Sequence, residues 1–431
     1  MSEIIVSSLI FAAALGLIFT EKVHRTIVGI VGAVIMVGAG LLMGFYSEEA
    51  AVESLNVETL ALLFGMMVMV ALLQPTGFFQ YLAIMAGRWS KGNPVRLFIL
   101  LGALTTVLSM FLDNVTTVVL IAPVTILITE LLGLSPVPFL ISAALLSNTG
   151  GVATLVGDPP NVLIGSAVGL TFNDFLTHSL PVIVFVWMAS LGLLVWLSRA
   201  ELGANPKAAQ RIKNLDPAKA LEDPKTARKV LIVLGTAVLL FFIHHLMGIS
   251  PAYVALCAAA AALLWVRPED LTTVFEHVEW PVLIFFAALF VMVGGVESAG
   301  AFEKVAELFA GLAESTSPRL FGVLMIWVVA LLSAVIDNIP ITVALIPVLQ
   351  SLGAAGIDVT PLWWALVFGA GLGGNGTIIG STANVVVVSL SEKTRHPITA
   401  AFWLKRGLPV MLLSCVVVSL LYALFFPLFT R

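Results

Sequence analysis

Two stretches of this sequence place carboxylate and amide side chains inside apolar runs. The first, residues 113–161, begins with Asp-Asn and ends with GDPPN; the second, residues 337–384, begins with Asp-Asn and ends with GSTAN. The copies lie 224 residues apart at the Asp and 223 at the last Asn. Such oxygens can bind a cation, a proton or a hydroxylated solute. Duplicated polar interruptions of apolar segments are typical of a transporter's binding site.

The carboxylates in these stretches need a physical reason. A charged residue at the centre of a spanning helix costs about 2.5 to 3.5 kcal/mol, and Asp113, Asp158 and Asp337 all fall in apolar surroundings. One reading is helix capping, since an Asp at a helix start accepts free backbone N–H groups. Capping alone does not require the same pair in two copies. Where two helical arms meet, free carbonyls and free N–H groups also suit a bound solute.

The second part of each motif predicts a helix broken inside the membrane. Glycine in both copies, and two prolines in the first, interrupt 153–161 and 376–384, and only a cavity filled by water or ligand can satisfy the freed backbone groups. Asn148, Thr149 and Thr154 precede the first break, and Asn375 and Thr377 precede the second. These side chains either face the bound solute or join helices by hydrogen bonds.

Composition defines the environment of these motifs. The chain is 60% hydrophobic and 11% charged, with a mean hydropathy of +1.08, whereas soluble domains are about 25% charged. This predicts an all-α polytopic membrane protein. The run 4–20 lacks a basic leader and a cleavage site, so we interpret it as a spanning helix. Cys257 and Cys415 stand alone, which predicts neither a disulfide framework nor a metal site, and no nucleic-acid partner is expected.

About ten runs are long enough to cross ~30 Å of hydrocarbon. They fall near 4–20, 26–45, 58–76, 136–170, 179–198, 229–247, 251–266, 280–296, 361–391 and 408–428. Two pairs of shorter arms meet at the Asp-Asn sequences, and we interpret them as re-entrant hairpins over 97–130 and 319–354.

Basic residues predict the orientation. The most basic loop is 199–228, which we interpret as a cytoplasmic linker between two halves, 1–198 and 229–431. Each half holds one hairpin and one broken helix (136–170 or 361–391), and the charge pattern gives the halves opposite orientations. This is the inverted-repeat plan of secondary transporters, in a multi-pass protein of the cell (inner) membrane.

Four strings carry a family resemblance: DNVTTVVLIAPV, SNTGGVATLVGDPPNVLI, DNIPITVALIPV and GGNGTIIGSTANVVVVS. They resemble the arsenite permease and sodium/proton antiporter branch (ArsB/NhaD type) of the ion transporter superfamily, which includes the melanosomal P protein. The resemblance implies a homodimer with a scaffold domain and a transport domain that moves by an elevator mechanism. The implied substrate site comprises Asp113, Asn114, Thr116, Asn148, Thr149, Gly157 and Asn161, with Asp337, Asn338, Asn375, Thr377, Ser381 and Asn384.

The two tip aspartates bear on the substrate. Asp113 and Asp337 in one cavity would repel a dianion, so a cation or a neutral solute exchanged for protons is favoured over a dicarboxylate. Neutral arsenite offers hydroxyls that match Asp, Asn and Thr, and isolated cysteines argue against thiolate capture. We expect proton-coupled efflux of arsenite or antimonite, with Asp113 and Asp337 carrying the proton, a proton gradient as energy source and no cofactor. Sodium/proton antiport remains the alternative.

Other classes fit less well. A channel would need a continuous polar stripe, and here polarity is confined to mid-membrane breaks. An enzyme would need a nucleophile with a base or a metal cluster, and no His lies near the Asp motifs in sequence. The sequence has no P-loop, so coupling to ATP would require a separate ATPase subunit.

Overall fold

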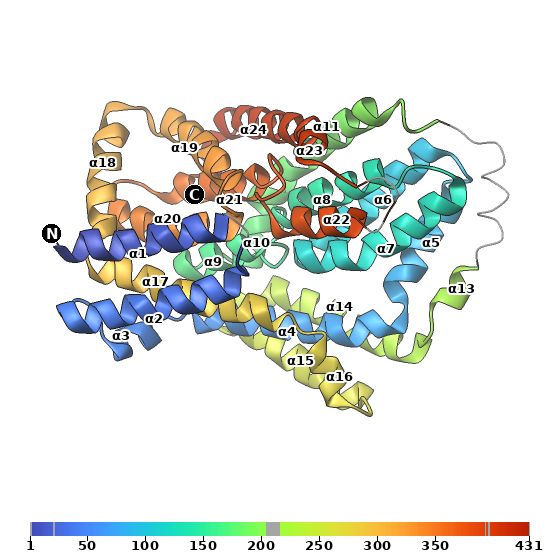
Figure 1. Ribbon diagram of the computed structural model, residues 1–431, viewed down its shortest axis with the longest axis horizontal. Coiled ribbons are helices and arrows are strands. Elements are labelled where there is room, and N and C mark those ends of the chain that lie inside the picture. Colours follow the sequence, from blue (N-terminus) through green and yellow to red (C-terminus); the bar gives the residue numbers. More distant parts are fainter. Residues whose placement is uncertain (1, 20–21, 204–215, 393, 395–396, 431) are drawn as a thin grey trace.

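Helices form every regular element in the part of the chain that the structure describes. A computed structural model describes residues 2–19, 22–203, 216–392, 394 and 397–430 (Figure 1). The predicted all-α fold class is confirmed. Short elements join the main helices: α3 (Glu48–Glu53), η1 (Gln74–Thr76), α10 (Phe172–Asp174), a π-helix (η2, Phe175–Ser179), α13 (Pro217–Ala220), α16 (Leu271–Glu276), α23 (Ala400–Leu404) and η3 (Phe426–Leu428).

Seven helical stretches among the described residues are long and apolar enough to cross a membrane: Arg25–Met43, Val57–Thr76, Asn114–Leu132, Phe172–Ser198, Pro224–Met247, Trp280–Ser298 and Ala400–Leu424. Ten were expected. One reason for the difference is that glycine and proline divide two of the expected runs. The run 136–170 is α8 (Val137–Gly151) followed by α9 (Pro159–Val168), and the run 361–391 is α21 (Thr360–Gly373) followed by α22 (Thr382–Glu392).

The arms around each Asp-Asn pair are separate helices. In the first half α6 (Pro94–Ser109) and α7 (Asn114–Leu132) are joined by residues 110–113. In the second half α19 (Pro318–Ser333) and α20 (Asn338–Ala354) are joined by residues 334–337. We call 110–114 the first tip and 334–338 the second tip, each including the Asn that starts the second arm.

The duplication extends well beyond the motifs. Helix α3 and helix α16 have the same length and begin 223 residues apart, and so do α5 (Phe78–Trp89) and α18 (Ala301–Ser315). The helices that flank the tips and breaks keep the same spacing to within one residue. The two halves are therefore structural copies along most of their length.

The helices form two layers, which Figure 1 shows as lower and upper groups. The flanking layer contains α1 (Ser2–Phe19), α2 (Arg25–Met43), α4 (Val57–Leu73), α14 (Pro224–Met247), α15 (Pro251–Val266) and α17 (Trp280–Ser298). Within it α2 packs on α17, and α4 packs on α15. The hairpin layer contains α6 to α9 and α19 to α22, with α11 (Leu180–Ser198) and α24 (Gly407–Leu424) packed together against it.

The predicted linker, 199–228, lies only partly within the description. Residues 204–215 fall outside the described residues. In the remainder, α13 packs on α5, and the backbone N–H of Glu222 donates to the carbonyl oxygen of Thr76 at 2.9 Å. The segment after the gap is therefore held against the first half.

Candidate substrate site

Glycine allows each tip to approach the broken helix of its own half. A Cβ atom on Gly157 would lie 2.7 Å from the carbonyl oxygens of both Gly151 and Ser109, which is closer than a real Cβ contact. Gly380 repeats this arrangement, since its Cβ would lie 2.7 Å from the carbonyl oxygen of Gly374. The absence of a side chain at these two positions lets three backbone segments meet.

The asparagine that ends each motif satisfies the backbone of its break. The Nδ2 of Asn161 donates to the carbonyl oxygens of Gly151 and Thr154, at 3.0 and 2.7 Å. Asn384 makes the same two bonds in its own break, at 2.8 and 2.9 Å. Carbonyls freed by the end of a helix are thereby paired in a site that excludes water.

The two tip aspartates have different partners. Asp113 caps α7: its Oδ1 accepts from the backbone N–H of Thr116 at 2.9 Å, and its Oδ2 accepts from the Thr116 hydroxyl at 2.5 Å. Asp337 has no such cap. Its Oδ2 accepts instead from the Thr382 hydroxyl at 3.0 Å and from Nη1 of Arg25 at 3.1 Å. Capping therefore explains Asp113 in part and does not explain Asp337.

Asp158 lies between the two tips and receives hydrogen bonds from both. The Nδ2 of Asn338 is 3.1 Å from Oδ2 and 3.3 Å from Oδ1 of this carboxylate, and the Asn114 side chain also bonds to it. Asp158 is only 1% exposed. Its counterpart in the other half is Ser381, so this carboxylate makes the two copies chemically unequal.

A small cavity of about 30 Å³ lies between the tips. It is lined by Arg25, Met67, Asp113, Asn114, Val115, Asp158, Pro159, Glu279, Val282, Asn338, Ile339, Ser381 and Thr382. Among these lining residues, the carboxylates of Asp113, Asp158 and Glu279 face one cation, Arg25. We call this cavity the tip cavity.

Glu279, the residue before α17, brings a further acid to the tip cavity. Its Oε1 accepts a hydrogen bond from the Thr116 hydroxyl at 3.1 Å. Burial raises the pKa of Glu279 to about 7, and the nearby charge of Asp113 acts in the same direction. A carboxyl group with this pKa can gain or lose a proton near neutral pH.

A second polar cluster joins the two halves beside the tip cavity. The Nδ2 of Asn148 donates to Oδ1 of Asn375 at 2.9 Å and to Oδ1 of Asn384 at 3.1 Å, and its own Oδ1 accepts from the Ser381 hydroxyl at 2.9 Å. Asn375 in turn donates to the Thr149 hydroxyl at 3.4 Å. The Asn148 amide is occupied by protein partners, as expected of a residue that joins helices.

The candidate residues from the sequence therefore divide into three groups. Four line the tip cavity: Asp113, Asn114, Asn338 and Ser381. Two contact its lining residues through hydrogen bonds: Thr116 and Asp337. The remaining seven lie in the breaks or in the cluster that joins the halves: Asn148, Thr149, Gly157, Asn161, Asn375, Thr377 and Asn384.

Sequence reasoning missed four polar residues of the tip cavity: Arg25, Asp158, Glu279 and Thr382. Asp158 carried a signal, as a carboxylate in an apolar run, but it was not placed among the site residues. Arg25 was used only as an indicator of orientation. Glu279 and Thr382 have no polar or charged signal that repeats, because their counterparts are Asn56 and Pro159.

The fold and site define a membrane transporter. Over 94% of this chain, and 98% of the other, the structure resembles the YdaH transporter of Alcanivorax borkumensis, with a TM-score of 0.59 and 17% identity. A family model described as citrate transporter matches residues 15–369, and the chain belongs to that family.

The relatives are also named as membrane proteins or transporters. The chain is 38% identical over 418 residues to the uncharacterized transporter Rv2685 of Mycobacterium tuberculosis, with 96% of each chain covered. It is 34% identical over 495 residues to the human P protein, covering 96% of this chain and 59% of that protein. The expected relationship to the P protein is thus confirmed, and the protein is a multi-pass transporter rather than an enzyme.

Proposed function

We propose that this protein is a secondary active transporter that exchanges protons for a small polar solute bound between the two tips. The observation that carries the proposal is the position of Asp158, which is buried and bonded to asparagines of both tips. A carboxylate shared by two mobile tips links its protonation to their arrangement. Asp113 and Asp337, one on each tip, are the proposed proton carriers.

The size and charge of the tip cavity support a small solute. A cavity of about 30 Å³ has room for one or two water-sized groups. Asp113, Asp158 and Glu279 would repel a free tricarboxylate, and one Arg25 guanidinium does not offset them. The tip cavity therefore favours a cation or a neutral hydroxylated solute over an uncomplexed citrate ion.

Arsenite or antimonite is the leading candidate solute, in the direction of efflux. The neutral trihydroxides can donate to the carboxylates and accept from asparagine amides such as those of Asn114 and Asn338. Neither Cys257 nor Cys415 lines the tip cavity, so binding would use oxygen and nitrogen partners alone. No thiolate is required for a solute that must also be released.

Sodium is the second candidate. Hard monovalent cations bind carboxylate, carbonyl and hydroxyl oxygens, and Asp337 has a buried Oδ1 with no hydrogen-bond partner. That oxygen is available to a cation or to a proton. The favouring observation is thus a specific free ligand atom at the second tip.

For the transport cycle we propose an elevator movement. The tips and broken helices would move together past the flanking layer, carrying the bound solute across the bilayer. The active unit would be a homodimer in the inner membrane with 199–228 on the cytoplasmic side, driven by the proton gradient.

The test is flux into proteoliposomes that contain the purified protein. Uptake of arsenite, antimonite and radioactive sodium would be measured with an imposed pH gradient and, as the control, after the gradient is collapsed. We expect one of these solutes to accumulate only when the gradient is present. Equal flux of every solute with and without the gradient would contradict the proposal.

A further inference from the structure

Arg25 connects the flanking layer to the second half of the site. It is the first residue of α2, and its Nη1 donates to Oδ2 of Asp337 at 3.1 Å and to the hydroxyl of Thr382. Its guanidinium carbon lies 5.3 Å from the centre of the Phe285 ring of α17. Side-chain exposure of the Arg25–Asp337 pair is 18% and 13%. A largely buried cation of one layer thus bonds to both the tip and the break of the other.

Arg25 also stands where two cavities meet. A cavity of about 270 Å³, which we call the Arg25 vestibule, is lined by Leu15, Ile18, Val23, His24, Arg25, Val335, Ile336, Asp337, Ile379, Thr382 and Val385. The vestibule shares Arg25 and Thr382 with the tip cavity. A solute that moves from the vestibule to the tip cavity passes this ion pair.

The contact is one-sided with respect to the internal repeat. The residue 223 positions after Arg25 is Gly248, which has no side chain to offer. The counterpart of Glu279 is Asn56, whose Nδ2 donates to the Ser166 hydroxyl at 3.1 Å rather than to a tip. The charged contacts described here between the flanking layer and the tips therefore belong to one of two pseudo-symmetric arrangements.

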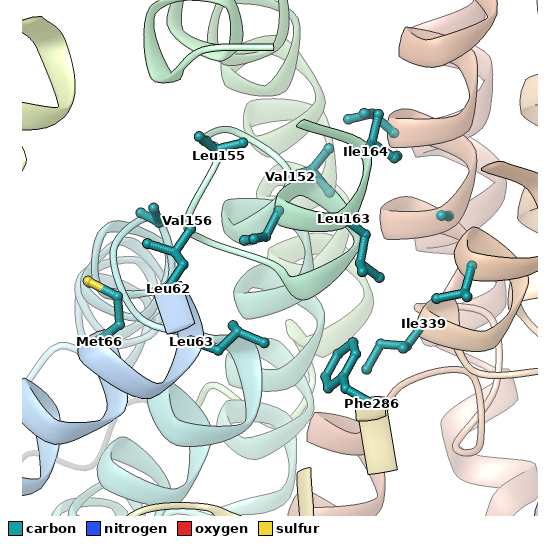
Figure 2. Close-up of a cluster of buried hydrophobic side chains, with 14 of the residues drawn as sticks. Leu62, Leu63, Met66, Val152, Leu155, Val156, Leu163, Ile164, Phe286 and Ile339 are labelled. Carbon is teal, nitrogen blue, oxygen red and sulfur yellow. The ribbon is translucent and has the colours of Figure 1, made fainter. Parts of the chain in front are cut away.

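A second vestibule lies on the opposite side of the repeat. It is a cavity of about 220 Å³ lined by Glu58, Leu62, Leu155, Val162, Gly165, Ser166, Gly169, Leu170, Thr171, His244, Ser250 and Pro251, and we call it the His244 vestibule. None of these residues lines the tip cavity. Apolar side chains of α4, the first break, α9, α17 and α20 gather between these elements, among them Leu63, Val156 and Ile339 (Figure 2).

We propose that Arg25 is a tethered counter-ion that holds the second tip in this arrangement while Asp337 is empty, and releases it when a proton or the transported solute occupies Asp337. The coupling part of this inference rests on the proposed function. The structural part does not: it requires only that the Arg25–Asp337 pair stabilises the state in which the Arg25 vestibule meets the tip cavity and the His244 vestibule does not.

The chemistry of Asp337 supports a displaceable pairing. Arg25 and Thr382 bond to Oδ2 alone, and Oδ1 is buried without a partner. A proton or a cation that binds Oδ1 lowers the attraction of the carboxylate for the guanidinium. The other charged or titratable groups near this pair are Asp158, His24 and Glu279. An unloaded Asp337 would leave an uncompensated charge if it moved away from Arg25, which opposes movement of the empty tip.

The first test measures accessibility and needs no transport. In a protein with Cys257 and Cys415 replaced by serine, one cysteine is introduced at Val335, in the Arg25 vestibule, or at Ser166, in the His244 vestibule. A water-soluble thiol reagent is applied at pH 8.5 without solute. Arg25→Gln should lower the Val335-to-Ser166 ratio of labelling rates by fivefold or more. Arg25→Lys should keep it within twofold. An unchanged ratio in Arg25→Gln would overturn the proposal.

The second test is the pH profile of flux. Without its cation partner Asp337 should hold a proton to higher pH, so the midpoint in Arg25→Gln should move alkaline by about one pH unit or more. Arg25→Lys should restore it, and Lys22→Gln, which removes an exposed charge from the same loop, should leave it unmoved. A slower Arg25→Gln with the wild-type midpoint would show a structural role only. Wild-type flux without proton coupling would remove the proposed function, and the labelling test would still decide the role of Arg25.

Discussion

The side-chain nitrogen of Asn338 lies 3.1 Å from a carboxylate oxygen of Asp158, although 180 residues separate them in the chain. Asn338 begins the second arm of one half, and Asp158 stands in the broken helix of the other. The bond ties the second tip to the first break at the point where the first tip also arrives. A solute in the tip cavity thus contacts groups that both halves control.

Loss of the Asn338 amide should impair transport. A hydrogen bond to a charged group contributes about 1.5–3 kcal/mol, so Asn338→Ala should reduce flux about tenfold or more while the protein remains folded. Asn173→Ala is the matched control, because the Asn173 Nδ2 donates to the Phe242 carbonyl at an exposed position. Initial rates in proteoliposomes would measure both. Wild-type rates in Asn338→Ala would show that Asp158 needs no donor from the second tip.

The glycine of the first break should be required for stability. Alanine at Gly157 would place Cβ 2.7 Å from two backbone oxygens, and overpacking of this kind costs about 1–3 kcal/mol. We therefore expect a lower unfolding temperature in detergent. Gly192→Ala is the control, because no atom lies within 4 Å of its added Cβ and alanine favours helix. Equal unfolding temperatures for the two variants would contradict the close approach.

The cluster around Asn148 should matter more for stability than for solute binding. Asn148→Ala removes three hydrogen bonds and leaves buried groups of Asn375, Asn384 and Ser381 without this partner. We expect a loss of about 1–3 kcal/mol in the free energy of unfolding, measured by chemical or thermal denaturation. The apparent affinity for solute should change less than twofold in protein that remains folded. A large change in affinity with unaltered stability would instead place Asn148 in the binding site.

Glu279 should make stability depend on pH. Its pKa is raised from 4.5 to about 7 in the folded protein, so between these values the folded state keeps a proton that the unfolded chain has released. The free energy of unfolding should therefore fall as pH rises through this window. Glu279→Gln should weaken the dependence, whereas Glu276→Gln, at an exposed position nearby, should not. Parallel unfolding temperatures of wild type and Glu279→Gln from pH 4.5 to 7.5 would refute this.

The sequence contained enough information to predict the fold class and the place of the site. Composition indicates a membrane protein, and the duplicated Asp-Asn pairs and glycines occur where the tips and breaks lie. The reason is physical: each of these residues is costly or disruptive inside an apolar helix, so it stands out against the hydrophobic background.

The division of roles among the polar residues could not be predicted in the same way. Asn148 and Asn338 are both amides in repeated motifs, yet Asn148 joins helices and Asn338 bonds to a buried carboxylate. Arg25 and Glu279 come from the flanking layer and meet the tips only through the packing of α2 and α17. Contacts between segments more than 150 residues apart leave no local pattern in the chain.

The most direct test of the central claim is the simultaneous measurement of solute and proton flux in proteoliposomes. Wild-type protein should move the two in a fixed ratio and in opposite directions. Asp113→Asn and Asp337→Asn should each lose at least nine-tenths of the proton flux and of solute accumulation driven by the pH gradient. Undiminished proton-coupled accumulation in both variants would contradict the role assigned to the acidic tips.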